Sequence, residues 1–182
     1  MLGIGLYATA TTTLASRRQE LFLKRLRSGT LPDTAILVGL LLPLVLVAVI
    51  QIAIILGVLA TASGTTPGNV ALLAFGVVAA ALMCVGVAMA TSAATVSAER
   101  AQVTSVPFLI ALLAGGIWVG STGPDELSWI ERHTPGGAIS EVSGAWAEMT
   151  WADSLPGLLA LAAWVAVGAA ASLRFFRWEP RH

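Results

Sequence analysis

Few residues in this sequence are of a type that does acid–base or metal chemistry, and the candidates lie in one polar stretch. Asp125, Glu131 and His133 fall within residues 120–154. Such groups form a catalytic or metal site only when the fold brings them together, and their spacing does not require this. A single cysteine, Cys84, supplies neither an internal disulfide nor a Cys/His zinc set. We therefore expect no catalytic residue, no metal site and no cofactor.

A nucleotide-binding motif is also missing from the sequence. No segment has the form GxxxxGK[ST], the loop that holds phosphates in many ATPases. If ATP drives this protein, a separate subunit must hydrolyse it. The formal net charge of zero does not point to nucleic acid, and we expect no nucleic-acid partner.

The composition is that of a membrane protein. Hydrophobic residues make up 57% of the chain and charged residues 11%, and residues 34–98 hold no charged side chain at all. A soluble domain needs a solvated surface, which such a stretch cannot provide. Four apolar stretches are long enough to cross a hydrocarbon layer about 30 Å thick. They are residues 35–60, 70–91, 103–119 and 155–173. We predict one all-α domain, residues 1–182, folded as a polytopic membrane helix bundle.

The N-terminal stretch is harder to assign. Residues 1–16 are uncharged and Thr-rich but too short for a full span, which needs about 20 residues. We expect a partial span, the inner end of a descending helix, with a re-entrant or interfacial segment as the alternative. Ser16 and Gln19 fit a capping box, which predicts that a separate helix begins at Ser16.

Orientation follows from the basic residues. Nine of the ten Lys and Arg residues fall on one side of the predicted bundle, in residues 17–33, at Arg100 and in the tail 174–182. Only Arg132 falls on the other side, within residues 120–154. Because cytoplasmic segments carry the excess of Lys and Arg, we expect the C-terminus to be cytoplasmic and residues 120–154 to be extracellular. Tryptophans cluster at the expected outer boundary, as interfacial anchors do: Trp118, Trp129, Trp146 and Trp151.

The segment 17–33 predicts a cytoplasmic amphipathic helix. Basic residues surround apolar ones in RRQELFLKRLR, and Gly29 and Pro32 are typical of a helix end. Two interpretations remain open from the residues alone. The helix either lies on the membrane surface and contacts anionic lipid, or it docks a partner protein.

The order of these motifs resembles the permease subunit of type-2 ABC exporters, the ABC-2 family. In that family a basic stretch of the form R-x-x-G/E-x-x-K-R-L-R-x-x-P-L follows the second membrane helix. Downstream, residues 86–100 (GVAMATSAATVSAER), 107–120 (PFLIALLAGGIWVG) and the tail 174–179 (RFFRWE) are similar to later parts of such permeases. A full permease has six spans, and the given sequence corresponds to one lacking the first.

The resemblance implies partners and site residues. Residues 17–33 would be the coupling helix that contacts a separate ABC ATPase subunit, through Arg17, Arg18, Glu20, Lys24, Arg25 and Arg27. Two permeases, identical or different, would form the pathway in the plasma membrane of a bacterial cell. Because the spans carry no charge, an apolar or amphiphilic substrate such as a drug, an antibiotic or a lipid-linked molecule is expected.

Two features inside the spans are candidates for helix contacts. Gln51, in the middle of residues 35–60, is a candidate pathway residue or, more simply, makes an interhelical hydrogen bond. Gly116 and Gly120 form a GxxxG pair that can permit close helix approach.

Two other classes of function stay open. The chain could be a non-transporting structural or assembly protein, including an inactive truncated permease. A membrane-embedded enzyme would instead require a catalytic cluster around Glu131 and His133 in the outer segment.

Overall fold

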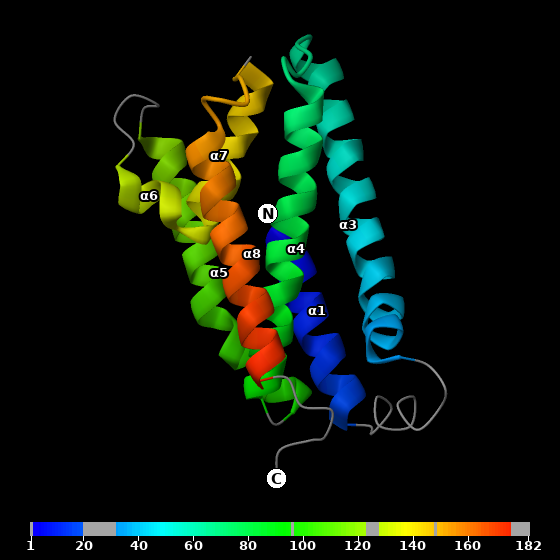
Figure 1. The fold of residues 1–182 in the computed structure, drawn as a ribbon. Helices are drawn as coiled ribbons and strands as arrows, with labels where there is room; N and C mark the ends of the chain where they lie inside the picture. Colours follow the sequence, from blue (N-terminus) through cyan, green and yellow to red (C-terminus); the bar gives the residue numbers. More distant parts are fainter. Residues whose placement is uncertain (1, 20–31, 96, 123–127, 148, 176–182) are drawn as a thin grey trace.

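Within the residues that the structure describes, the chain is helical and has no strand. The computed structural model describes residues 2–19, 32–95, 97–122, 128–147 and 149–175. Its helices, in chain order, are α1 (Leu2–Gln19), α3 (Asp33–Ser63), α4 (Val70–Ala94), α5 (Ala98–Ser121), α6 (Trp129–His133), α7 (Pro135–Ser143), the 3-10 turn η1 (Gly144–Ala147) and α8 (Leu155–Phe175). Four of them, α3, α4, α5 and α8, are long and apolar enough to cross a membrane. The predicted all-α polytopic bundle is confirmed (Figure 1).

Capping residues set where the spanning helices begin and end. These helices therefore extend beyond the apolar stretches predicted from the sequence. Gly64, with φ of 66°, ends α3 in the left-handed conformation that glycine adopts without strain. The Asn69 side chain accepts a hydrogen bond from the Leu72 amide at 3.0 Å and so starts α4. At the other end of the bundle, Ser97 accepts from the Arg100 amide and starts α5.

Helix α1 is one continuous helix, and the prediction that a new helix begins at Ser16 is wrong. Ser16 lies inside α1, so its hydroxyl does not cap a helix start there. The helix packs along α4, α5 and α3 within the bundle. Its Tyr7, Ala10, Thr11 and Leu14 are fully buried. It is therefore part of the helix bundle, and its assignment as a partial span stays a prediction.

Helix α4 is the centre of the bundle and contacts α1, α3, α5, α7 and α8. Its most extensive partner is α8, and two glycines let the backbones meet. A Cβ added to Gly168 would lie 2.9 Å from the carbonyl carbon of Gly86, closer than real side chains come. The Ser172 hydroxyl bonds the carbonyl oxygen of Gly86 across this crossing at 2.9 Å. The hydrophobic effect does not join helices within lipid, so close packing at these small residues holds α4 and α8 together.

A second glycine contact joins α7 to α5. A Cβ on Gly136 would overlap the carbonyl oxygen of Leu112, and one on Gly115 would overlap the Thr134 side chain. Gly120 has nothing within 4 Å among the described atoms. Of the predicted Gly116–Gly120 pair, Gly116 takes part in this contact, since a Cβ on Gly136 would lie 2.6 Å from its backbone nitrogen, whereas Gly120 makes no close contact with the described residues.

Helix α3 stands partly away from the rest (Figure 1). Its lower half packs on the bundle through Ile36, Leu41 and Ala48, which are buried. Above them, Ile54 and Val58 are 60% and 61% exposed. In a bilayer such side chains face lipid, so this exposure costs nothing there.

We expect Gly136→Ala to destabilise the protein by about 1–3 kcal/mol, because the added methyl overpacks the α5–α7 contact. The matched control is Gly120→Ala, which adds the same methyl to a spanning helix in open space. Thermal unfolding of the detergent-purified protein measures the difference. Equal midpoints for the two variants would show that α7 does not approach α5 as described.

Candidate transport site and outer segment

The two faces of α1 differ in chemistry. One face is buried, whereas Gly5 and Thr9 on the opposite face are exposed and Thr12 and Ser16 are partly exposed. Positions 5, 9, 12 and 16 repeat at the three- to four-residue spacing of a single helix face. The exposed faces of α3 and α5 present Val, Leu and Ile side chains instead. The open face of α1 is therefore small and hydroxyl-bearing, unlike the lipid-facing sides of its neighbours.

Two hollows adjoin the first turn of α1. One, of about 240 Å³, lies between α1, α3, α4 and α7, and the other, of about 280 Å³, lies between α1, α5 and α7. Both include Gly3 and Ile139 in their walls. Nearly all of the other lining side chains are aliphatic, with Ser140 and Ser143 as the hydroxyl groups. The hollows can hold hydrocarbon, and they contain no group that could do acid–base chemistry.

The outer segment is tied to the end of α5 by Glu131. The Glu131 carboxylate accepts hydrogen bonds from the Ser128 amide at 2.6 Å, the Ser128 hydroxyl at 2.9 Å and the Thr122 hydroxyl at 3.0 Å. These bonds to the charged form, the Ser128 amide first, hold the pKa of Glu131 below its usual range. Glu131 therefore serves as the capping residue of α6.

His133 is also used structurally. Its ring nitrogen Nδ1 lies 2.6 Å from the Trp129 carbonyl oxygen, and its own carbonyl oxygen accepts a bond from the Trp164 indole N–H at 2.8 Å. Among the described residues, no three His, Cys, Asp or Glu side chains come together as a metal site. Asp125 lies outside the described residues.

Three aromatic rings connect α1 to this outer segment. The Tyr7 ring lies 4.6 Å from that of Phe108 on α5, and Phe108 lies 6.0 Å from Trp164 on α8, measured between centroids. Trp164 in turn reaches the His133 carbonyl. At the other side of α1, the Tyr7 hydroxyl lies 3.0 Å from that of Thr91 on α4. The three rings, Tyr7 fully buried and the other two partly buried, form a chain of contacts from α1 through α5 to α8.

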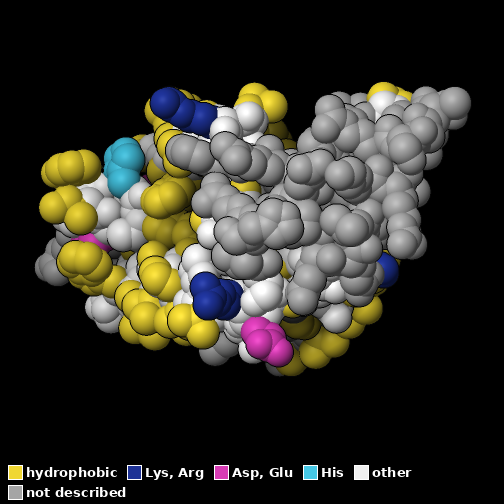
Figure 2. Space-filling model, turned by 90° about the horizontal axis from the view of Figure 1, so that it is seen from below, with side chains coloured by type: hydrophobic (Ala, Val, Ile, Leu, Met, Phe, Trp, Pro, Cys, Tyr) yellow, Lys and Arg dark blue, Asp and Glu magenta, His cyan; other side chains and the backbone are white. Residues whose placement is uncertain are grey.

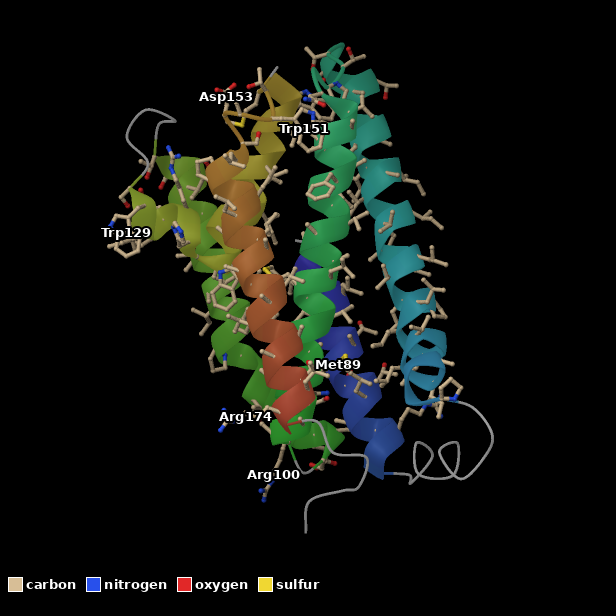
Figure 3. All side chains as sticks on the ribbon, in the orientation of Figure 1. Met89, Arg100, Trp129, Trp151, Asp153 and Arg174 are labelled. Atoms are coloured by element: carbon tan, nitrogen blue, oxygen red, sulfur yellow. The ribbon has the colours of Figure 1, made fainter. Side chains whose placement is uncertain are left out.

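Charged side chains gather at the two ends of the bundle. Arg100 and Arg174 point away from the lower end, and Asp153 lies at the upper end together with the exposed Trp129 and Trp151 (Figure 3). Seen from below, Lys and Arg side chains and acidic ones lie among apolar side chains (Figure 2). The wall between the two ends is apolar, as a bilayer requires.

Comparison with protein families decides the class. The model of the ABC-2 family transporter protein matches residues 1–174, nearly the whole chain. The chain belongs to the ABC-2 transporter family. No curated protein and no solved structure matches it significantly. As an ABC-2 membrane protein it is the multi-pass permease component of an ABC transporter, a component that normally pairs with an ABC ATPase subunit.

The predicted ATPase contacts of this ABC-2 permease lie at or beyond the lower end of α1. Arg17 and Arg18 are in the last turn of α1. The other four, Glu20, Lys24, Arg25 and Arg27, lie outside the described residues. The coupling helix stays a prediction.

Gln51 lies in the middle of α3 and is exposed. Its side chain makes no hydrogen bond to any described residue, so the predicted interhelical bond is not formed within that part of the chain. An amide at this depth in a bilayer needs a polar partner. A role of Gln51 in the pathway of the ABC-2 permease stays a prediction.

Sequence reasoning missed two polar contacts of the outer segment. One is the Trp164–His133 bond, and the other is the ion pair, 3.3 Å long, between the partly exposed Arg132 and the buried Glu141. Trp164 and His133 are far apart in the sequence. Arg132 and Glu141 lie in one polar segment, and no motif there predicts that they pair.

We expect Trp164→Phe to destabilise the permease by about 1–3 kcal/mol, because the His133 carbonyl loses its donor in a place without water. The same change at Trp151 is the control, since that ring is 47% exposed and packs edge-on against Phe75. Thermal unfolding in detergent compares the two. A loss no larger for Trp164→Phe than for Trp151→Phe would contradict a role for the N–H group.

Proposed function

We propose that this ABC-2 permease is the membrane half of an ATP-driven exporter and that two copies, identical or different, enclose the transport pathway. The observation that carries the proposal is the chemistry of α1, which has a small, hydroxyl-bearing open face and, through Gly3 at its first turn, also lines two apolar hollows. A helix face of that kind is suited to a pathway wall and poorly suited to lipid. The aliphatic faces of α3 and α5 contact lipid or the second permease.

The substrate is amphiphilic or apolar: a drug, an antibiotic or a lipid-linked molecule. Support comes from the aliphatic lining of both hollows and, separately, from the hydroxyl groups of Thr9 and Thr12 on the open face of α1. Transporters of charged solutes and ion-coupled transporters normally carry ionisable residues within their spans. The described parts of α3 and α4 hold none between residues 35 and 94.

The ATPase binds at the lower end of the bundle, which faces the cytoplasm of a bacterial cell. Arg100 and Arg174 lie at this end (Figure 3), and seven of the eight other basic residues follow α1 or α8 in sequence or lie in their last turns, which supports that orientation. Residues 17–33 directly follow α1 in sequence. ATP binding to the partner shifts the permease between two states through this segment and α1. The permease contributes no catalytic residue to hydrolysis.

We expect Arg25→Glu to weaken co-purification with the partner ATPase by about tenfold or more, since reversing a contact charge replaces attraction with repulsion. The control is Arg100→Glu, the same charge reversal at the same end of the bundle but outside the coupling helix. Candidate ATPases are co-expressed and pulled down through the permease. If both variants bind as the unmodified chain does, residues 17–33 do not dock the ATPase.

We expect a cysteine at Thr9 to react with a water-soluble maleimide roughly ten times faster than one at Val58, because only thiolate in contact with water reacts. Val58 is 61% exposed on α3, so a slow reaction there reflects lipid and not burial. The buried Cys84 is first replaced by Ala in both variants.

Equal, slow labelling of the two cysteines in liposomes would place the α1 face in lipid. That result would favour the alternative of a structural membrane protein that transports nothing.

A further inference from the structure

Glu141 is a carboxylate buried among helices. It lies on α7 and is only 5% exposed, although the sequence places it in the polar outer segment. Its oxygen Oε1 is 3.3 Å from the Arg132 guanidinium, and its oxygen Oε2 is buried without a hydrogen-bond partner among the described residues. A buried carboxylate with one oxygen unsatisfied is costly, so a specific role is expected.

Helix α8 is shaped to receive this carboxyl group. A Cβ on Gly157 would lie 3.0 Å from Oε2 and 3.2 Å from the carboxyl carbon, so the absence of a side chain there makes the room. One turn earlier, the Ser154 hydroxyl is fully buried and also lacks a partner among the described residues. The first turn of α8 also carries the partial positive charge of a helix N-terminus.

The two members of the ion pair differ in their access to water. The Arg132 side chain is 28% exposed and belongs to the five-residue helix α6, whereas the Glu141 side chain is 3% exposed. Arg132 can therefore turn into solvent at small cost. Glu141 cannot follow it, and an uncompensated buried charge is strongly unfavourable. When the pair separates, Glu141 therefore binds a proton, because a buried carboxyl group is less unfavourable when neutral than when charged.

We propose that Glu141 is a proton-binding site of the outer segment, ionised while α6 is docked through Arg132 and protonated when α6 moves away. The proton comes from water on the outer side and adds to a carboxylate oxygen, and no other bond changes. Acid outside the cell then favours the form in which α6 is released. This inference deepens the proposed function. It rests on that function in one respect only, which is that the release of α6 opens the exit of the transport pathway.

The charged groups near Glu141 shift its pKa in the direction that this proposal requires. Burial raises the pKa of Glu141 above its usual range, while Arg132 and, less strongly, His133 lower it. Loss of Arg132 therefore raises the pKa further, so that separation and protonation favour each other. The described parts of α4, α5 and α8 that pack on α7 carry no Asp, Glu, Lys, Arg or His near it. Because His133 also acts on the pKa of Glu141, it is replaced by Gln in the test background.

The test measures the proton directly. The full chain with His133→Gln, reconstituted in nanodiscs without any ATPase, is titrated between about pH 4 and about pH 8 while the protonated-carboxyl band is followed by difference infrared spectroscopy. Glu141→Gln should remove one band, and Glu131→Gln and Asp153→Asn should not. The latter two acids have lowered pKa values and titrate in stronger acid. Arg132→Gln should move the midpoint of the Glu141 band upward by about one pH unit or more.

A second readout follows α6. A spin label at Ile130→Cys in a Cys84→Ala background, where residue 130 is 52% exposed on α6, should become more mobile in acid. In Glu141→Gln and Arg132→Gln it should be mobile at every pH, and either variant suffices if the other fails to insert. An absent Glu141 band, or a midpoint unmoved by Arg132→Gln, or label mobility unchanged in both variants, would each overturn the proposal. Because no ATPase is present, failure here is separate from failure of the exporter assignment.

Discussion

The absence of water in the bilayer is the constraint on which this structure depends. Every helix end and hydroxyl at membrane depth must find its partner within the chain. The Trp164 indole therefore donates to the otherwise open carbonyl of His133, and Thr134 both accepts from the Gly137 amide and donates to the Glu131 carbonyl between α6 and α7. At the α4–α8 crossing, the Ser172 hydroxyl bonds two carbonyl oxygens. These three side chains, from Trp164, Thr134 and Ser172, bond backbone groups where two elements meet.

Close contacts at glycines pack the outer segment into the core of the bundle. Gly136 lies against the backbone of α5, and Gly76 on α4 makes room for Val142 of α7. The helices α6 and α7 are thereby held between α4, α5 and α8. Glu141 is carried inward by the same contacts, which is why a residue from a polar segment is buried. The outer segment is a lid built into the bundle, and its position and the charge state of Glu141 are linked.

Properties that depend on local sequence were predictable. Unbroken apolar stretches gave the four spanning helices, and the ordered motifs of residues 17–33 and 86–120 led to the ABC-2 family, which the family model confirms. Properties that depend on contacts between distant residues were not predictable. Gly116 and Gly120 have the spacing of a packing motif, yet α7 packs against Gly115 and Gly116, and Gly120 has no described atom near it. Ser16 looked like a cap, yet α1 continues past it because the preceding residues are already helical.

The length of α3 ties the protein to the thickness of its membrane. Its apolar stretch, Ala35–Ser63, has 29 residues. At about 1.5 Å per residue it is roughly 43 Å long, well above the roughly 30 Å of a typical hydrocarbon core. A helix with such a hydrophobic mismatch tilts, or the bilayer thickens around it. Because the upper half of α3 is more exposed than its lower half and meets α4 through Leu56, it takes up the tilt and sets the width of the space beside α4. Lipid chain length thus becomes a variable that adjusts the shape of this permease without any ligand.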